Sequence, residues 1–238
     1  MFYESVRNLV RPFIKAWWRP EVVGLENIPS TGPVILASNH LANVDSFLVP
    51  VVTPRKVRYI IKADYWQQKG LKARVAQKFF ESIGSVPVER GTLKAAQGSL
   101  DAALGVLNDG GVFGIYPEGT RSKNGKLGKG RTGVAWLEEH SDAPVIPVGL
   151  RGTNALFVRG KLLPRPKAAK LRVAFGPPVD FTGIDRSLPE NQRRRLVTER
   201  VMDAIQELSG QDRAAQRPVD LQEPGADATA ATDEGAVA

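Results

Sequence analysis

The pattern of apolar and polar positions along the chain predicts alternating strands and helices. Short apolar runs without polar alternation indicate strands that are covered on both faces. Longer segments with apolar residues three and four positions apart indicate helices. The expected strands are 34–38, 57–61, 85–88, 112–116, 144–150 and an edge strand at 171–176, and the expected helices are 45–52, 71–83, 93–109, 133–140 and about 187–208. This alternation predicts an α/β domain built on a mostly parallel mixed sheet flanked by helices.

Local signals predict the end of one of these helices and the start of another. Gly110 and Gly111 should stop the helix over 93–109, because glycine readily adopts the left-handed conformation that ends helices. Ser187 and Glu190 have the spacing of a capping box, and Pro189 suits a first helical turn.

The N-terminal segment has a helical pattern of a different kind. Residues 2–18 read FYESVRNLVRPFIKAWW, with an apolar stripe bordered by arginine and lysine and with Pro12 inside it. We expect Pro12 to kink the helix or to divide it in two. A basic amphipathic segment with tryptophan at one end is typical of a helix that lies in a membrane interface, here through Phe13, Trp17 and Trp18. The alternative is an ordinary helix docked on the domain.

Charge and composition divide the chain into three parts. Residues 211–238 contain six acidic residues and two arginines, so this tail has a net charge of −4. Residues 1–210 therefore have a net charge of +12, and the two parts together give the chain's +8. The sequence predicts a membrane-association segment at 1–20, a folded domain at 21–210 that holds the candidate chemistry described below, and a disordered acidic tail at 211–238. The basic body predicts an anionic partner such as a membrane surface, a phosphorylated substrate or a nucleic acid.

Absent features exclude several kinds of chemistry. The chain has no cysteine, which rules out disulfides, zinc–thiolate sites, iron–sulfur clusters and cysteine nucleophiles. No apolar run approaches the roughly 18 residues that span a bilayer, and the N-terminus lacks the layout of a signal peptide. We therefore expect a cytoplasmic protein, free or lying on a membrane.

One histidine is placed where it can act as a general base. The stretch ILASNHLANVDSFLV puts His40 at the end of an expected strand and Asp45 at the start of an expected helix. A carboxylate that folds back onto the imidazole would fix its tautomer and stabilise the imidazolium that forms. On these residues alone, Asp45 as an N-cap and His40 as a surface loop residue remain open.

Other expected strands also end in charged residues beside glycine. YPEGTRS follows a strand at 116–122, GSVPVERG spans 84–91, and VIPVG spans 145–149. Ligands of α/β proteins bind at the carboxyl ends of the strands. Each such end is also compatible with a solvated loop.

Taken in order, these blocks resemble the four-block signature of the PlsC-type glycerolipid acyltransferases, which covers about 23–181 here. The matching residues are N-H-x-x-x-x-D from Asn39, G-x-x-P-V-x-R-G from Gly84, Y-P-E-G-T-R-S from Tyr116 and V-I-P-V-G from Val145. The resemblance implies a glycerol-3-phosphate acyltransferase-like fold. It implies transfer of an acyl group from acyl-CoA or acyl carrier protein to 1-acyl-sn-glycerol 3-phosphate, giving phosphatidic acid in phospholipid synthesis at the cytoplasmic face of the membrane, with no cofactor or metal.

The resemblance also assigns roles to individual residues. It implies a catalytic dyad of His40 and Asp45, and a phosphate contact by Arg90. The remaining substrate-binding residues that it implies are Lys62, Glu118, Gly119, Thr120 and Arg121. Ser46 is a weaker candidate for a catalytic nucleophile, because it is adjacent to Asp45 at the expected start of a helix.

Several alternatives stay open at this point. The acceptor could instead be glycerol 3-phosphate or a glycolipid hydroxyl, and a hydrolase could use the same dyad with water. The glycine-rich basic loop at 121–133 could bind coenzyme A phosphates or an acidic carrier protein, or could be a solvated loop. The basic charge would also suit a nucleic-acid-binding module, but the chain contains no recognisable nucleic-acid-binding motif.

Overall fold

The described residues of the protein form a seven-stranded sheet. We describe it from a computed structural model, in which residues 2–62, 70, 74, 77–78, 81–82, 85–88, 93–156 and 170–214 are described. The strands are β1 (Glu21–Val23), β2 (Val34–Ser38), β3 (Val57–Lys62), β4 (Val86–Val88), β5 (Val112–Ile115), β6 (Val145–Arg151) and β7 (Arg172–Phe175). They lie in the order β1-β7-β6-β2-β5-β3-β4, and every neighbouring pair is parallel except β6 and β7. The predicted mostly parallel mixed sheet is confirmed.

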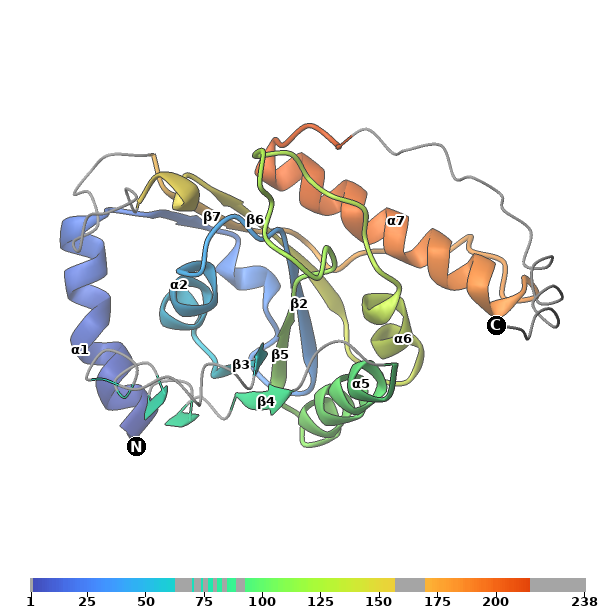
Figure 1. Cartoon of the computed structure of the whole chain (residues 1–238), viewed down its shortest axis with the longest axis horizontal. Helices are drawn as coiled ribbons and strands as arrows, with labels where there is room; N and C mark the ends of the chain where they lie inside the picture. Colours follow the sequence, from blue (N-terminus) through green and yellow to red (C-terminus); the bar gives the residue numbers. More distant parts are fainter. Residues whose placement is uncertain are drawn as a thin grey trace, which may run out of the picture.

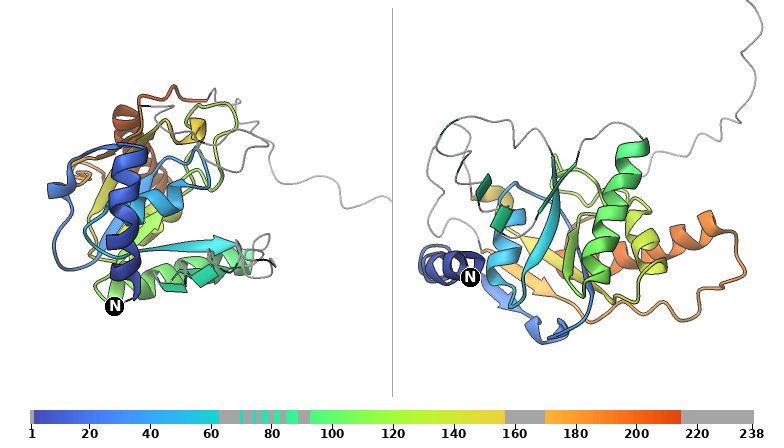
Figure 2. Two further views of the ribbon diagram at one scale, coloured as in Figure 1. Left: turned by 90° about the vertical axis from the view of Figure 1, so that its left-hand side faces the viewer. Right: turned by 90° about the horizontal axis from the view of Figure 1, so that it is seen from below.

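Helices cover both faces of this sheet (Figures 1 and 2). The helices are α1 (Phe2–Trp17), α2 (Asp45–Val52), α5 (Leu93–Asn108), α6 (Gly133–Glu139) and α7 (Glu190–Ser209), with short 3-10 turns at Leu25–Asn27 and Thr153–Ala155. In Figure 1, α1 and α2 lie on one side of the sheet, and α5, α6 and α7 lie on the other.

Strand β2 shows why the apolar runs lack polar alternation. Val34 and Leu36 belong to the core on the side of α1 and α2, whereas Ile35 and Ala37 belong to the core under α5, α6 and α7. All four side chains are fully buried. A strand with a core on each face needs apolar residues at every position.

The predicted edge strand at 171–176 is not at the edge. Strand β7 pairs antiparallel with β6 and parallel with β1, in the register that places Glu21 beside Arg172. Strand β1 is therefore the outer strand at this end of the sheet. Sequence reasoning missed β1 because it begins with a charged residue and contains only two apolar ones, so no apolar run marks it.

Two predicted helix features are not formed. Helix α1 is continuous through Pro12, so it is not divided in two there, and a kink at this residue stays a prediction. Pro12 has no N–H to donate to the carbonyl of Asn8, four residues earlier. Both residues face solvent, so water can bond to that carbonyl instead. The capping box is not formed, because the Ser187 N–H donates to Asp185 Oδ1 and α7 begins only at Glu190.

The folded domain extends past residue 210, where it was predicted to end. Residues 211–214 bond to the loop around Leu127: the Leu127 N–H donates to Asp212 O at 2.9 Å, and the Ala214 N–H donates to Leu127 O at 2.8 Å. The prediction of a disordered tail is therefore wrong for these four residues. Residues 215–238 lie outside the described part, as does most of the helix predicted at 71–83.

Candidate active site

Parallel pairing brings the two best-matched sequence blocks together. Ala37 of β2 lies beside Ile115 of β5 in the register of the sheet. The residues that follow, Asn39-His40 on one strand and Tyr116 to Glu118 on the other, therefore emerge at the same edge. Asp45 reaches this edge from the first turn of α2.

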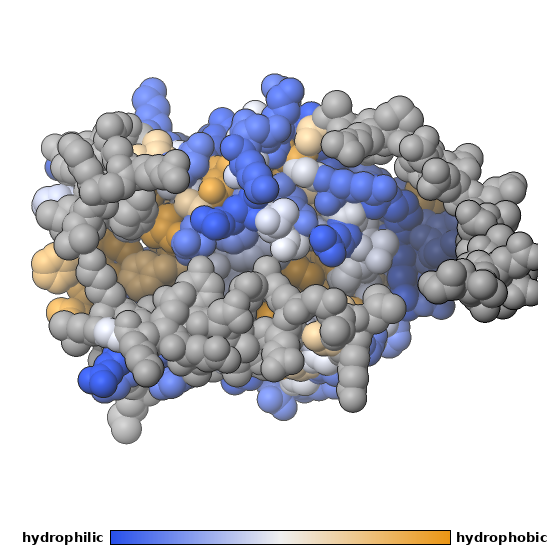
Figure 3. Space-filling model, viewed as in Figure 1, coloured by the Kyte–Doolittle hydropathy of each residue, from blue (hydrophilic) through white to orange (hydrophobic). Residues whose placement is uncertain are grey.

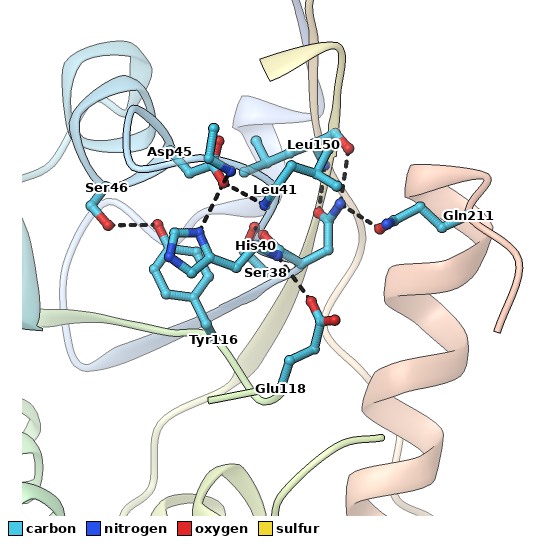
Figure 4. Close-up of polar contacts among 11 residues, drawn as sticks. Ser38, His40, Leu41, Asp45, Ser46, Tyr116, Glu118, Leu150 and Gln211 are labelled. Atoms are coloured by element: carbon cyan, nitrogen blue, oxygen red, sulfur yellow. Dashed lines mark hydrogen bonds and ion pairs between the residues drawn. The ribbon is translucent and has the colours of Figure 1, made fainter. Parts of the chain in front are cut away.

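His40 and Asp45 form a hydrogen-bonded dyad (Figure 4). His40 Nδ1 lies 2.9 Å from Asp45 Oδ2, and that oxygen also accepts the backbone N–H groups of Leu41 and Ala42, each at 2.7 Å. Asp45 is fully buried, whereas 15% of the His40 side chain is exposed. Because a carboxylate only accepts, Nδ1 carries the hydrogen and the His40 Nε2 lone pair is left for a substrate proton.

This geometry decides between the two interpretations of Asp45. The residue before α2 is Val44, and no side chain caps the helix N-terminus. The Asp45 carboxylate instead folds back onto the turn that carries His40. The predicted orientation of imidazole by carboxylate is thus present in the structure.

Tyr116 supports the imidazole from its face. The two rings stack with centroids 3.9 Å apart and planes inclined by 10°, and Tyr59 stacks behind Tyr116 at 5.2 Å. The Tyr116 hydroxyl lies 3.0 Å from Ser46 Oγ, so Ser46 pairs with the tyrosine. Burial raises the pKa of Tyr116 well above its usual value, which keeps this phenol neutral.

Glu118 holds the backbone of the site. Its Oε1 accepts the His40 N–H at 3.0 Å and its Oε2 accepts the Gly128 N–H at 2.7 Å, and only 6% of the residue is exposed. The resemblance placed Glu118 among the substrate-binding residues. In the structure its two carboxylate oxygens join the His40 turn to the loop after β5, and contact with a substrate stays a prediction.

Gly119 is required by the same turn. Its φ is 69°, which disfavours other residues, and a Cβ there would lie 2.8 Å from Arg131 Nε. Thr120 and Arg121 follow and are exposed, and the Ser122 N–H then donates to His40 O at 2.7 Å. Gly119, which is also exposed, Thr120 and Arg121 are therefore the predicted residues of this block that remain accessible to a ligand.

Of the two cationic residues predicted to bind the substrate, Lys62 and Arg90, the structure describes the backbone of Lys62. Lys62 ends β3, and its backbone pairs with Val88 at the end of β4. Arg90 comes two positions after Val88 and lies outside the described residues, and the Lys62 side chain is likewise not described. The described ends of β3 and β4 lie on the same sheet edge as His40.

Two further features bear on the chemistry. In the described ranges, no group of three or more histidine and acidic residues could hold a metal ion. Among the helices described, none combines the length and apolar character needed to cross a bilayer.

Residues 19–151 match the model of the family described as acyltransferase. The chain belongs to the acyltransferase family. This stretch contains both members of the dyad and Glu118. The family membership and the dyad together identify the chain as an enzyme and its chemistry as acyl transfer.

Relatives within the acyltransferase family have named substrates. The chain is 26% identical to 1-acyl-sn-glycerol-3-phosphate acyltransferase of Bacillus subtilis, over 87% of this chain and 96% of that protein. It is 28% identical to the enzyme of the same name from Borreliella burgdorferi, over 58% of this chain and 53% of that protein. The crystal structure of the 1-acyl-sn-glycerophosphate acyltransferase PlsC from Thermotoga maritima superposes with a TM-score of 0.61, at 26% identity, covering 86% of this chain and 82% of that one. The predicted PlsC-type fold is confirmed.

Sequence reasoning missed Tyr116 as a supporting ring and Gln211 as a neighbour of the site. Tyr116 opens the block Y-P-E-G-T-R-S, and an aromatic residue next to a predicted site could have drawn attention to it. Gln211 gave no such signal, because it is separated from His40 by most of the chain.

Proposed function

We propose that this acyltransferase moves a fatty acyl group from an acyl thioester to the free hydroxyl of 1-acyl-sn-glycerol 3-phosphate, forming phosphatidic acid for phospholipid synthesis. The observation that carries the proposal is the His40–Asp45 pair at 2.9 Å, with the imidazole partly open to solvent. The names of the relatives support the choice of acceptor.

The dyad provides both proton transfers of the reaction. His40 Nε2 takes the proton of the acceptor hydroxyl as its oxygen attacks the thioester carbonyl, and Asp45 stabilises the resulting imidazolium. The carbon–sulfur bond then breaks, and the imidazolium returns the proton to the thiolate that leaves. The acyl group goes directly to the acceptor, so no enzyme nucleophile is needed.

Cations at the same sheet edge are proposed to bind the anionic parts of both substrates. Arg90 and Lys62 are proposed for the acceptor phosphate, since β3 and β4 end at the edge that carries His40. Arg121 and Thr120 are exposed at that edge. The loop that follows contributes Lys123, Lys126 and Lys129, all exposed, for the anionic carrier of the acyl donor, which is coenzyme A or acyl carrier protein.

Helix α1 is proposed to rest the enzyme on the cytoplasmic face of an anionic membrane. Leu9, Phe13 and Trp17 are exposed by 66%, 67% and 52%, and their spacing of four places them along one side of the helix. Figure 3 shows hydrophobic surface gathered on the side of the molecule where α1 and α2 lie. Trp18, also predicted for membrane contact, packs against the core and is left out of this surface. Exposed Lys15 and Arg19 add about 1 kcal/mol each near anionic lipid.

The acceptor and the role of the base are tested together. Purified protein is given radiolabelled palmitoyl- and oleoyl-thioesters of coenzyme A and acyl carrier protein, with a panel of acceptors, and the lipid product is identified. We expect phosphatidic acid from 1-acyl-sn-glycerol 3-phosphate, and a kcat reduced about 100-fold or more in His40→Ala. His140→Ala is the matched control, because His140 is the chain's other histidine and ends α6 away from the dyad.

Two outcomes would change the proposal. A product formed only from glycerol 3-phosphate or from a glycolipid would replace the acceptor and keep the dyad. Arg90→Ala should raise the KM of the acceptor, and an unchanged KM would remove that residue from the phosphate site.

Membrane contact is tested by co-sedimentation with vesicles that contain anionic phospholipid. Deleting 1–19 would also remove Ile14, which is only 6% exposed and belongs to the core. The cleaner variant replaces Leu9, Phe13 and Trp17 by serine, with serine at the exposed positions Asn8 and Ala16 as control. Loss of sedimentation in the first variant alone supports the proposal, and retained sedimentation moves the contact elsewhere.

A further inference from the structure

The chain after α7 turns back toward the active site. Helix α7 ends at Ser209, and Gly210 follows in the left-handed conformation with φ of 62°. The next four residues, Gln211–Ala214, are here called the C-terminal strap. They lie against the loop 121–131, here called the basic loop, which leaves the His40 edge after β5.

Backbone hydrogen bonds join the strap to the middle of the basic loop. Leu127 donates to Asp212 O at 2.9 Å and accepts from the Ala214 N–H at 2.8 Å. The Leu127 side chain is 1% exposed, so the loop is also anchored in the core at this point. The strap thus fixes the centre of a segment whose lysines are all at the surface.

The side chain of Gln211 connects this loop to the strand end that carries the base. Figure 4 shows its contact with that strand end. Gln211 Oε1 accepts from Asn39 Nδ2 at 2.6 Å, and Gln211 Nε2 donates to Gly125 O at 2.7 Å. Asn39 is fully buried and directly precedes His40. The Asn39 amide also accepts the Leu150 N–H at 2.8 Å and donates to Leu150 O at 2.9 Å. These bonds hold Asn39 against β6 independently of Gln211.

The strap is held in turn by α7. Arg213 donates from Nη2 to Asp203 Oδ1 at 2.5 Å and from Nε to Gln206 Oε1 at 3.1 Å. Both partners lie in the last turns of α7, a helix packed on the sheet through Val201 and Ile205. The strap is therefore a rigid connection between the core and the basic loop.

We propose that Gln211 is a positioning residue for acyl transfer, which sets the basic loop at a fixed place beside His40. The proposal rests on the proposed function for the identity of the bound group, the anionic carrier of the acyl donor. Without Gln211, the loop lysines would lose their fixed place relative to the base, and donor affinity would fall. The His40–Asp45 contact does not involve the strap, so turnover at saturating donor would be kept.

The experiment uses Gln211→Ala and Gln211→Glu in the full chain. Glutamate can still accept from Asn39, but it places a second oxygen against Gly125 O and so breaks the link to the loop. Gln192→Ala is the matched control, because Gln192 is an exposed glutamine at the other end of α7. Thermal unfolding establishes that each variant is folded.

Two measurements are made on these variants. The first is the rate of tryptic cleavage after Lys123, Lys126 and Lys129, which needs no activity. The second is the separate determination of kcat and of KM for acyl-CoA. We expect both substitutions to speed cleavage and to raise the donor KM by about fivefold, the scale of one net hydrogen bond. The expected kcat stays within about twofold, and Gln192→Ala should match the native enzyme.

The outcomes separate this inference from the proposed function. Unchanged cleavage and unchanged donor KM in the folded Gln211 variants would overturn it, as would a fall in kcat with donor KM unchanged. If the native protein transferred no acyl group, cleavage of the loop would still test the strap. Should Gln211→Ala fail to fold, Gln211→Glu carries the test, because it keeps the bond to Asn39.

Discussion

The charge on Asp45 is the feature of the dyad that a single substitution can isolate. Asp45→Asn keeps the size of the side chain and one carbonyl oxygen, which can still accept from the Leu41 and Ala42 N–H groups. The fold of the turn should therefore be retained. What the variant loses is the negative charge beside the imidazolium that forms during proton transfer.

The size of the effect follows from the geometry of the pair. At the 2.9 Å between His40 Nδ1 and Asp45 Oδ2, the attraction between unit charges is about 1.4 kcal/mol in water and about 6 kcal/mol at an effective dielectric of about 20. Asp45 is fully buried, which favours the upper part of this range. Since each 1.36 kcal/mol is a factor of ten in rate, kcat should fall about 10²- to 10⁴-fold.

The assay is steady-state transfer of a labelled acyl group to 1-acyl-sn-glycerol 3-phosphate at saturating substrates. Asp142→Asn is the control, because it makes the same change at an exposed aspartate. Circular dichroism and thermal unfolding verify that both variants are folded. A folded Asp45→Asn enzyme with kcat within about threefold of the native value would refute the electrostatic role of this carboxylate.

Substitutions at three other positions test further contacts of the structure. Tyr116→Leu removes the ring that stacks on His40 and should lower kcat about 2- to 10-fold, whereas Tyr116→Phe keeps the stack and should stay near native; equal losses would contradict a role for stacking. Glu118→Gln leaves one of two backbone N–H groups without an acceptor and should lower the free energy of unfolding by about 1–3 kcal/mol in denaturant titrations, and an unchanged midpoint would argue against it. Burial alone would raise the pKa of Glu139, but hydrogen bonds from two arginines of α7 outweigh it and hold the pKa below its ordinary 4.5. The Tm deficit of Glu139→Gln should therefore be complete at pH 7 and shrink as pH falls below about 4.5, and a deficit independent of pH would exclude this pair as its source.

The order of strands and helices could be predicted because each depends on local pattern. Apolar runs such as the one at 34–37 have no polar positions since both faces of β2 are covered, and that property is visible in the sequence. The helix boundaries were less predictable. Pro12 lies inside a continuous helix because it faces solvent, where a missing backbone hydrogen bond is tolerated. The capping box at Ser187 is not formed, because the Ser187 N–H donates to Asp185 instead.

The site divides in the same way. His40 and Asp45 are five residues apart, so a strand-to-turn-to-helix pattern allows them to meet, but only the structure excluded the alternative of Asp45 as an N-cap. Glu118 could be placed near them by its sequence block, but its hydrogen bond to the Gly128 N–H exists only in the folded loop.

The sequence by itself determined the α/β class, the strand end that carries the base, and the resemblance to acyltransferases, because these rest on residues close together in the chain. The tertiary structure alone decided that β1 is the outer strand, that Tyr116 stacks on the imidazole, and that Gln211 reaches Asn39. Contacts between residues 76 or 172 positions apart are set by how the strands pair and how α7 packs on the sheet. No local pattern records that choice, since each of these side chains would be equally acceptable on an exposed loop.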